Sequence, residues 1–278
     1  MKKLYLVLLL AVAVMSCKDN KPAQTETAAQ AAAEDSAKAN ADTIGIDSNE
    51  VTPPKAVDEL FADFIYSYTT NRSFQYRRTD FPLKKYANGK FVGVVNRIEW
   101  KFDRLYCKHN LHIIILDGEK ELGNLISLRP DTVRVERFQF GRKRCKQYVF
   151  ARENGRWRMN RINYFPISRH KDAAFWAFYE KFATDSVFQS KHLDETIGFI
   201  TYDEDNHFKK IEGLIESDQW PVFHPELPAK DIFNIDYGLG LHNRKVRVVS
   251  VRGNSNGMSS MFKFVKRKGT WKLVKFEN

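Results

Sequence analysis

The sequence predicts an α+β fold made of two related units, and three observations lead to this prediction. The chain has 278 residues, which suits one large domain or two ordinary ones. In each half, apolar residues first follow a helical spacing and later alternate with polar residues, as in helices followed by an antiparallel sheet. An internal repeat with an offset of 114 residues relates the two halves.

Residues 1–16 are predicted to be a lipoprotein signal peptide. Lys2 and Lys3 precede an apolar run at residues 4–14, which has about half the length that a membrane-spanning helix needs. The run leads into Val-Met-Ser-Cys, ending at Cys17, which resembles a bacterial lipobox. The resemblance implies cleavage before Cys17, attachment of a diacylglycerol to its thiol and of a palmitate-like chain to its amine, and a lipid-anchored protein of the cell envelope. An ordinary signal peptide with a chance cysteine is the alternative.

The next segment, residues 17–54, is predicted to be a disordered tether behind the lipid anchor. It is rich in Ala, Thr, Gln and acids, and residues 18–54 carry a net charge of −4. Such a composition buries too little apolar surface to offset the entropy of ordering. Lys18 follows the lipidated cysteine, so by resemblance to sorted lipoproteins we expect the outer membrane. Periplasmic and surface-exposed orientations both stay open.

The internal repeat divides the remaining chain into two predicted domains, 55–170 and 171–278. Near the start of each copy, matching residues lie 114 positions apart: Phe61, Phe64, Tyr68, Asn71 and Gln75 over Phe175, Phe178, Phe182, Asp185 and Gln189. The same offset returns near the end: Phe150, Gly155 and Trp157 over Phe264, Gly269 and Trp271. Agreement at both ends without a net insertion indicates two copies of one unit.

Each copy is expected to open with a helix and to close with a hairpin. Residues 57–68 carry one apolar stripe at three- and four-residue spacing, and residues 172–182 repeat it behind a potential N-cap at Asp172. Alternating residues predict strands over 111–116, 132–140, 147–151, 232–237, 246–251 and 261–265. Asn154-Gly155 and Lys268-Gly269 predict the hairpin turns.

The aromatic opening helix and the closing hairpin with its tryptophan resemble the NTF2-like (cystatin-like) cone. In that fold a curved antiparallel sheet wraps around helices. The tandem arrangement behind a lipobox resembles a bacterial envelope lipoprotein family of unknown function, with paired NTF2-like domains over residues 57–278. The resemblance implies structural motifs alone, so no catalytic residue is carried over from it.

Candidate catalytic and metal residues are weak. Asp80 and Asp194 match in the repeat and could act as a general base inside a cone, although such residues are more often helix caps or turn residues. His109 and His112 lie three apart near Cys107, but on a strand that spacing turns them to opposite faces. We therefore predict no catalytic residue, no metal site and no cofactor.

Cys107 and Cys145 are predicted to form a disulfide. The second copy has Pro221 and Ser259 at the matching positions, so both cysteines occur in one copy and both are missing from the other. The cell envelope is oxidising, which favours such a bond. Two separate buried thiols are the alternative.

Charge is concentrated in the first predicted domain. Residues 57–170 have 23 basic and 12 acidic residues, whereas 171–278 have 16 and 15. Arginine suits bidentate contacts to phosphate or carboxylate. The candidate anion-binding residues are Arg134, Arg142, Lys143, Arg144, Lys146, Arg156 and Arg158. A basic face that only keeps the protein soluble is the alternative.

These observations favour a noncatalytic envelope lipoprotein that acts as a binding or interaction module. Its expected partners are the membrane, through the lipid anchor, and an anionic envelope polymer, a lipid headgroup or another envelope protein. The envelope location excludes nucleic acid as a partner. The alternative function is an enzyme of isomerase or hydrolase type that uses a pocket in one cone.

Overall fold

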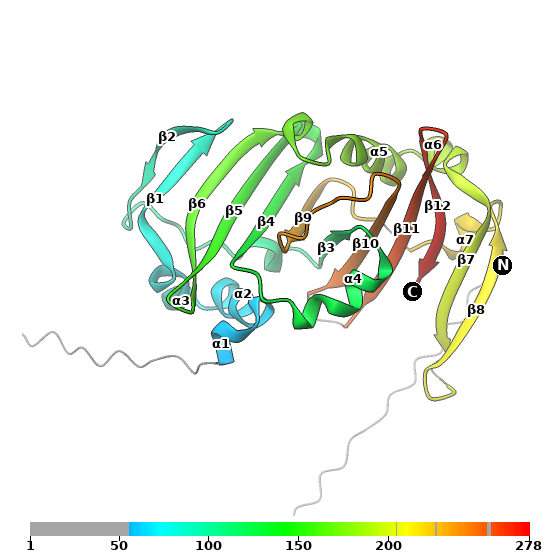
Figure 1. Cartoon of the computed structure of the whole chain (residues 1–278), viewed down its shortest axis with the longest axis horizontal. Coiled ribbons are helices and arrows are strands. Elements are labelled where there is room, and N and C mark those ends of the chain that lie inside the picture. The colour runs from blue at the N-terminus through cyan, green and yellow to red at the C-terminus, as the bar shows by residue number, and fades with distance from the viewer. Residues whose placement is uncertain (1–55, 204, 226, 255–256) are drawn as a thin grey trace, which may run out of the picture. The chain divides into compact units, whose positions relative to one another are not determined.

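A single continuous sheet organises the protein in this computed structural model, which describes residues 56–203, 205–225, 227–254 and 257–278 (Figure 1). Within these residues the sheet has twelve strands in the order β2-β1-β6-β5-β4-β9-β3-β10-β11-β12-β7-β8. The predicted signal peptide, Cys17 and the tether lie outside the described residues. The strands are β1 (Thr79–Ala87), β2 (Lys90–Val95), β3 (Leu111–Leu116), β4 (Thr132–Gln139), β5 (Arg144–Glu153), β6 (Arg156–Pro166), β7 (Leu193–Asp203), β8 (Lys209–Glu216), β9 (Asp231–Asp236), β10 (Val246–Gly253), β11 (Ser259–Arg267) and β12 (Thr270–Glu277).

Short helices connect and cover these strands. The helices are α1 (Ala56–Glu59), α2 (Phe61–Thr70), α3 (Arg72–Arg77), α4 (Glu119–Asn124), α5 (Ala173–Thr184), α6 (Ser186–Lys191) and α7 (Trp220–Phe223). Single 3₁₀ turns are η1 (Leu105–Lys108), η2 (Leu125–Ser127), η3 (Phe140–Arg142) and η4 (Ile167–Arg169). No helix of the described residues is long and apolar enough to cross a bilayer.

The two central strands change places between the halves of the chain. Counted from either edge, the outer strands follow the same order, β2-β1-β6-β5-β4 and β8-β7-β12-β11-β10. The next strand comes from the other half in both cases: β9 pairs antiparallel with β4, and β3 pairs antiparallel with β10. The two halves of the chain therefore share one sheet, and the division into two domains at residue 170 stays a prediction.

The sheet is mixed, whereas the sequence analysis predicted an antiparallel sheet. Strands β1 and β6 are parallel, as are β7 and β12, and β3 and β9. Parallel neighbours need a long crossover, and several elements separate the members of each pair along the chain. Alternation of apolar and polar residues along one strand identifies its two faces but not the direction of the neighbouring strand. The parallel pairs could therefore not be predicted from this alternation.

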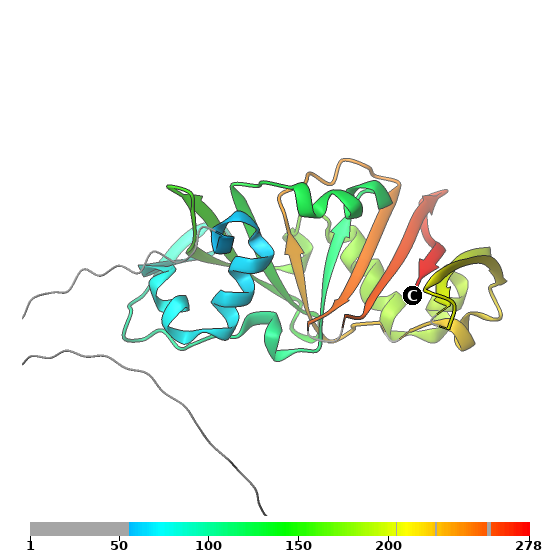
Figure 2. The same ribbon diagram turned by 90° about the horizontal axis from the view of Figure 1, so that it is seen from below.

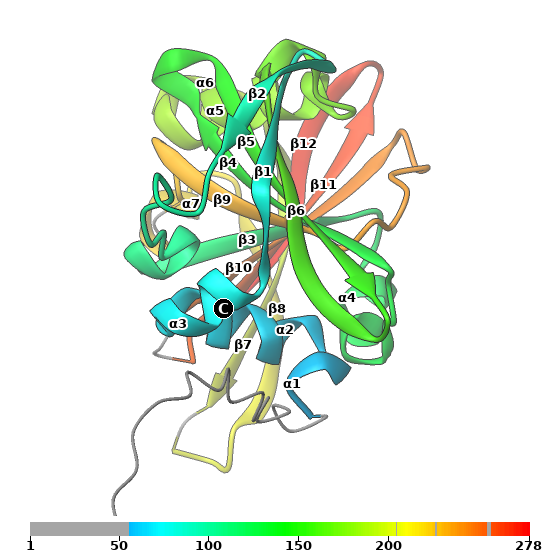
Figure 3. The same ribbon diagram turned by 90° about the vertical axis from the view of Figure 1, so that its left-hand side faces the viewer.

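Two hydrophobic cores lie on opposite faces of the sheet. Consecutive residues of β3 point to opposite faces, and Ile113 belongs to the core beneath α5, whereas Ile114 belongs to the core beneath α2. In Figure 3, α2 and α3 lie at the bottom and α5 and α6 at the top. Figure 2 shows the strands between them from a second direction. Each group of helices thus covers one face over one half of the sheet.

The helices are held by aromatic side chains with closely similar geometry in both cores. In the first core, the Phe61 and Trp157 ring centroids are 5.1 Å apart at 75°. In the second core, the corresponding distance between Phe175 and Trp271 is 5.2 Å at 76°. Edge-to-face pairs of this kind stabilise a core beyond their area burial. Each core is therefore filled by its own aromatic rings.

A buried glutamine fixes the second helix of each half. Asn71 and Asp185 cap α3 and α6 by accepting the backbone N–H three residues later, each at 2.9 Å. Gln75, on α3, accepts from Trp100 Nε1 at 3.0 Å and donates to the carbonyl oxygen of Tyr68 at 3.0 Å. On α6, Gln189 makes the same pair of contacts with Trp220 Nε1 and the carbonyl oxygen of Phe182. The repeated Asn/Asp and Gln positions thus have a structural cause.

The predicted strands and turns are confirmed where the pattern is strong. Leu111–Leu116 is a strand with the predicted bounds, and both hairpin turns have positive φ at two successive residues, as a type I′ turn requires. Asp172 lies at the N-cap position of α5, but its carboxylate makes no capping bond and binds Arg247 Nε at 2.7 Å instead.

Replacing Gln75 by Ala is expected to lower the free energy of unfolding by about 2 to 4 kcal/mol, because the Trp100 indole N–H and a buried carbonyl oxygen lose their partner. Urea unfolding followed by tryptophan fluorescence measures this change. Val187→Ala on the exposed surface of α6 is the control and should change stability by less than about 0.5 kcal/mol. Equal effects of both substitutions would contradict the role given to Gln75.

Candidate functional site

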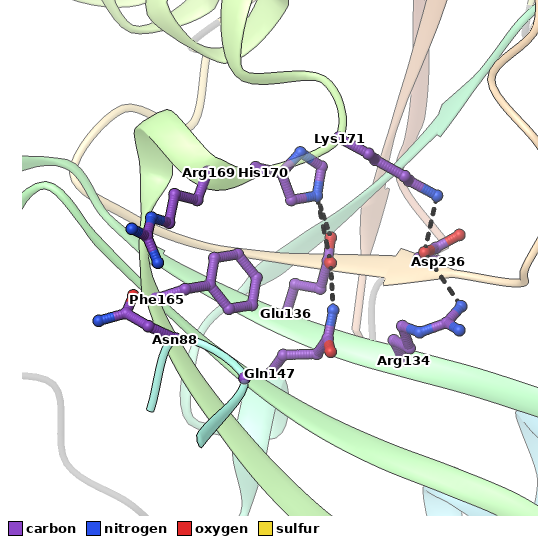
Figure 4. Close-up of a pocket in the computed structure, with 10 residues that line it drawn as sticks. Asn88, Arg134, Glu136, Gln147, Phe165, Arg169, His170, Lys171 and Asp236 are labelled. Atoms are coloured by element: carbon purple, nitrogen blue, oxygen red, sulfur yellow. Dashed lines mark hydrogen bonds and ion pairs between the residues drawn. The ribbon is translucent and has the colours of Figure 1, made fainter. Parts of the chain in front are cut away.

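A cavity of about 430 Å³ lies where β4, β5, β6 and β9 meet the segment that leads into α5 (Figure 4). Its floor is the sheet face opposite to α2, since Val135 faces the α2 core and the next residue, Glu136, lines the cavity. The lining residues are Asn88, Gly89, Arg134, Glu136, Gln147, Phe165, Arg169, His170, Lys171 and Asp236.

Glu136 is the centre of a buried polar network beneath the cavity. Only 1% of this residue is exposed. Its carboxylate accepts from Gln147 Nε2 and from Asn234 Nδ2, each at 2.9 Å. His170 Nε2 lies 3.2 Å from the same carboxylate. These partners come from β5, from β9 and from the segment between the halves, so one side chain ties three parts of the chain together.

The ring of His170 is engaged at both nitrogens. The backbone N–H of Asp172 donates to Nδ1 at 3.0 Å, so Nδ1 is an acceptor and the proton resides on Nε2. Nε2–H then donates to Glu136. His170 is only 8% exposed and packs edge-on against Phe138, with ring centroids 5.3 Å apart. This arrangement leaves neither ring nitrogen free for a ligand.

Two opposing effects set the pKa of Glu136. Burial alone would raise the pKa. The hydrogen bonds from His170, Asn234 and Gln147 lower it by a larger amount and hold it below its ordinary value. The carboxylate is therefore ionised at neutral pH. A buried charge of this kind is tolerated because donors surround it.

A second carboxylate, Asp236, organises the cations at the cavity wall. Lys171 Nζ donates to it at 2.8 Å, and Arg134 Nη1 lies 3.6 Å from it. The backbone N–H of Gly238 donates to Asp236 at 3.0 Å. This tight turn requires a φ of +78° at Gly238, which glycine adopts without strain. Asp236 is 8% exposed. Its carboxylate is therefore buried beneath the two cations, which lie between it and the solvent.

The open side of the cavity combines an aromatic ring, an amide and a cation. Phe165 and Gly89 border this cavity and also an adjoining hollow of about 410 Å³ that includes Arg161. Arg169 is exposed and has no ion-pair or hydrogen-bond partner among the described residues. Asn88 follows β1 and offers its side-chain amide. The walls therefore carry groups that can bind both a charged and a hydroxylated ligand.

The seven candidate anion-binding residues do not form one surface. Arg134 alone among them lines the cavity. Lys143 pairs with Glu180 at 2.7 Å, and Arg158 forms an ion pair with Asp80. Lys146 packs its Nζ 4.3 Å from the Tyr148 ring, and burial lowers its pKa. The remaining three, Arg142, Arg144 and Arg156, do not line this cavity.

The predicted disulfide is not formed, since Cys107 and Cys145 are both free. Cys107 lies against the core beneath α2, with its sulfur 3.1 Å from Thr69 Oγ1. Cys145 lies in the core beneath α5, on the opposite face of the sheet. The sheet therefore separates the two thiols, and the joint loss of both cysteines from the second half has no structural cause here.

The other candidate residues have structural partners. Asp80 and Asp194 lie in β1 and β7 rather than at caps or turns, and each forms an ion pair with an arginine, Arg158 and Arg267 respectively. His112 Nδ1 lies 2.7 Å from Asn254 Oδ1, and the His109 ring contacts Phe233. None of these four side chains lines the cavity.

The site residues predicted from the sequence do not include Glu136, His170 or Asp236. One feature of the sequence pointed to the first: Glu136 is an acid inside a predicted strand, in line with Arg134 and Phe138 on the same face. Asp236 gave the same kind of signal, as an acid inside the predicted strand 232–237, whereas His170 lies between the predicted elements and gave none.

Comparison with known proteins places this architecture in a family. A family model described as a domain of unknown function, DUF4348, matches residues 40–278. The chain belongs to this family. The crystal structure of an NTF2-like protein from Bacteroides fragilis is similar to it, with 33% sequence identity and a TM-score of 0.71 over 80% of this chain and 96% of that chain. No curated protein matches the chain. The prediction of an α+β, NTF2-like fold is therefore confirmed for this DUF4348 protein.

Replacing Glu136 by Gln is expected to lower the free energy of unfolding at pH 7 by about 2 to 3 kcal/mol, because an amide offers one acceptor oxygen to three donors. Glu153→Gln removes an exposed charge from β5 and is the control. Urea unfolding measures both, and equal stabilities would contradict the network.

The pH dependence provides a separate prediction for Glu136. Since its pKa in the folded protein lies below the ordinary value of 4.5, the ionised group stabilises the fold above that pH, and this contribution is lost as the pH falls through the lowered pKa. We expect the free energy of unfolding to fall less steeply between about pH 5 and pH 3 in Glu136→Gln than in the unaltered protein. Parallel curves would show that Glu136 has the same pKa in both states.

Proposed function

We propose that this DUF4348 protein is a noncatalytic, lipid-anchored binding module of the cell envelope, which holds an anionic ligand in the cavity beside Glu136. The observation that carries the proposal is the charge arrangement around that cavity. Arg134, Lys171 and Arg169 face it, whereas its two carboxylates, Glu136 and Asp236, are already occupied by donors. A ligand thus meets three cations and two carboxylates that already accept hydrogen bonds, and Arg169 is the cation of the three with no carboxylate partner among the described residues.

The state of the buried network supports binding rather than proton transfer. A general base needs a free lone pair within reach of the substrate and a pKa near the working pH. His170 uses both ring nitrogens, and the pKa of Glu136 is lowered rather than raised. The aromatic rings of the two cores also fill the interior that an enzyme of this fold would use as a pocket.

The chemistry of the walls suggests an acidic sugar unit as the ligand. Arginine and lysine bind carboxylate, the Asn88 amide can bond hydroxyl groups, and the Phe165 ring offers an apolar face to a sugar ring. A cavity of about 430 Å³ is in the size range of small-ligand sites. Acidic glycans are available in the cell envelope, so they are the partner we propose.

We further propose that the fold consists of two NTF2-like units that exchanged their central strands. The identical strand order from both edges supports this, as do the matched ring pairs in the two cores. The register shift between β5 and β6 at Val149/Phe150 also recurs between β11 and β12 at Lys263/Phe264. The cavity lies where β9 of the second unit pairs with β4 of the first unit. A single unit therefore has no equivalent cavity.

The lipid anchor and the outer-membrane location rest on the lipobox-like sequence ending at Cys17. A diacylated and amide-acylated cysteine would hold the protein durably at a membrane. The acidic segment up to residue 54 would then connect the anchor to the sheet.

The cavity proposal is tested by binding of glucuronate, measured by isothermal titration calorimetry, with glucose as the uncharged comparison. We expect glucuronate to bind more tightly than glucose. Arg169→Ala should weaken glucuronate binding about tenfold, since a hydrogen bond to a charged group contributes about this much. Arg169 has no partner among the described residues, so the fold should keep its stability. Lys191→Ala, on exposed α6, removes an equal charge and should leave binding unchanged. Equal binding of both sugars, or equal loss in both variants, would refute the proposal.

The anchor proposal is tested by Cys17→Ser. Metabolic labelling with radioactive palmitate should mark the unaltered protein and not the variant, and the variant should leave the membrane fraction. Cys107→Ser is the matched control and should keep the label. Labelling of Cys17→Ser would show that the lipid is attached elsewhere.

A further inference from the structure

A second basic hollow lies on the first half of the chain, away from the cavity. It has a volume of about 400 Å³ and is formed by α3 together with the turn that follows β2. Its lining residues are Arg72, Ser73, Tyr76, Arg77 and Arg97. Three of the five carry a guanidinium group, and none carries a carboxylate.

These three arginines have no acidic partner among the described residues, unlike two of the arginines near them. Arg78, between α3 and β1, pairs with Asp58 at 2.8 Å, and Arg158 on β6 pairs with Asp80. In contrast, no ion pair of Arg72, Arg77 or Arg97 is present within the described residues. Two of the three lie over the Tyr76 ring: Arg72 is 5.7 Å and Arg97 is 5.8 Å from its centroid.

Tyr76 holds the hollow in shape. Its hydroxyl donates to the carbonyl oxygen of Trp100, and Trp100 in turn is held by Gln75. Arg97 Nη1 lies 3.4 Å from the Tyr76 carbonyl oxygen, and its guanidinium also lies over the Phe81 ring. Because the ring is fixed at both ends, the two guanidinium groups beside it are positioned in advance of any ligand.

Three like charges around one hollow repel one another, and an anion placed among them relieves this repulsion. The planar guanidinium fork matches the oxygen spacing of phosphate, and several arginines together can contact the different oxygens of one phosphate group. The Ser73 hydroxyl is a further donor at the edge of the hollow. Phosphate chemistry therefore suits this set of side chains.

The neighbouring surface favours a lipid as the source of the phosphate. Ile98 follows Arg97 directly and is 94% exposed, and the nearby strand β2 leaves Phe91 59% exposed. Apolar side chains beside cations are typical of surfaces that touch the interface of an anionic bilayer. The second half lacks these features, since Ser186, Val187, Ser190 and Lys191 stand 114 residues after Arg72, Ser73, Tyr76 and Arg77.

We propose that Arg72, Arg77 and Arg97 form a binding site for the phosphate of an anionic lipid headgroup. The site is separate from the cavity beside Glu136, and it does not depend on the lipid anchor. It would hold the first half of the sheet against a membrane surface and leave the cavity facing its ligand from another side of the protein.

Vesicle co-sedimentation of the full chain carrying Cys17→Ser tests the proposal without the acyl chains. Vesicles of phosphatidylcholine with phosphatidylglycerol should bind the protein, whereas vesicles of phosphatidylcholine alone should bind it weakly. The triple variant R72Q/R77Q/R97Q should bind the anionic vesicles about a hundredfold more weakly, because each cation near such a surface contributes about a factor of five. The control triple K191Q/K209Q/K268Q removes the same charge from exposed positions of the second half and should bind as before.

Two further measurements separate the source of the phosphate and the two sites. Inorganic phosphate should compete with the vesicles, and vesicles charged equally by oleate should bind less well than those with phosphatidylglycerol. Glucuronate binding should be the same in both triple variants, so this proposal can fail while the cavity proposal stands. Equal losses in the two triples would show an effect of net charge alone and overturn the site. Unchanged vesicle binding in R72Q/R77Q/R97Q would overturn it as well.

Discussion

The buried carboxylate of Glu136 is the interaction on which the arrangement of the two halves depends. It lies on β4 in the first half, and its donors include Asn234 on β9 in the second half and His170 between them. An ionised group with 1% exposure is stable only when donors replace the water it has lost. Placing β9 beside β4 supplies one of these donors. Strand β9, the segment that leads into α5 and the floor of the cavity therefore meet at this one carboxylate.

The same constraint supports the binding role that we propose for this site. A group that must keep three donors to stay buried cannot give up one of them to a substrate without loss of stability. Glu136 and His170 thus form a fixed floor. The groups that can contact a ligand are Lys171, which is bound to Asp236, and the exposed Arg169. Because the residues of the floor are already ordered, they lose little conformational entropy when an anion binds to the cations above them.

The sequence predicted the parts of the fold that follow from local pattern and from the repeat. Helical and alternating spacing identified the aromatic faces, because Phe64 and Phe178 must be buried whatever strands surround them. The exchange of β3 and β9 could not be predicted, since both strands carry apolar side chains on both faces and fit beside either β4 or β10. Choosing between those partners requires the polar contact between Glu136 and Asn234, which lie 98 residues apart.

The charge of the proposed binding surfaces also depends on contacts between residues that are distant in the sequence. A count along the chain treats Arg158 and Arg97 alike. The first is paired with Asp80, whereas the second, within the part of the chain that the structure describes, contacts aromatic rings and a carbonyl oxygen. The block from Arg129 to Lys171 has the higher density of cations, yet ion pairs with acids on other elements remove several of them from the surface charge. Three cations without a carboxylate partner among the described residues, Arg72, Arg77 and Arg97, lie together on α3 and in the turn after β2, outside that block. Binding potential in a basic domain is therefore set by which cations the fold leaves unpaired, and folding decides this only after distant strands have met.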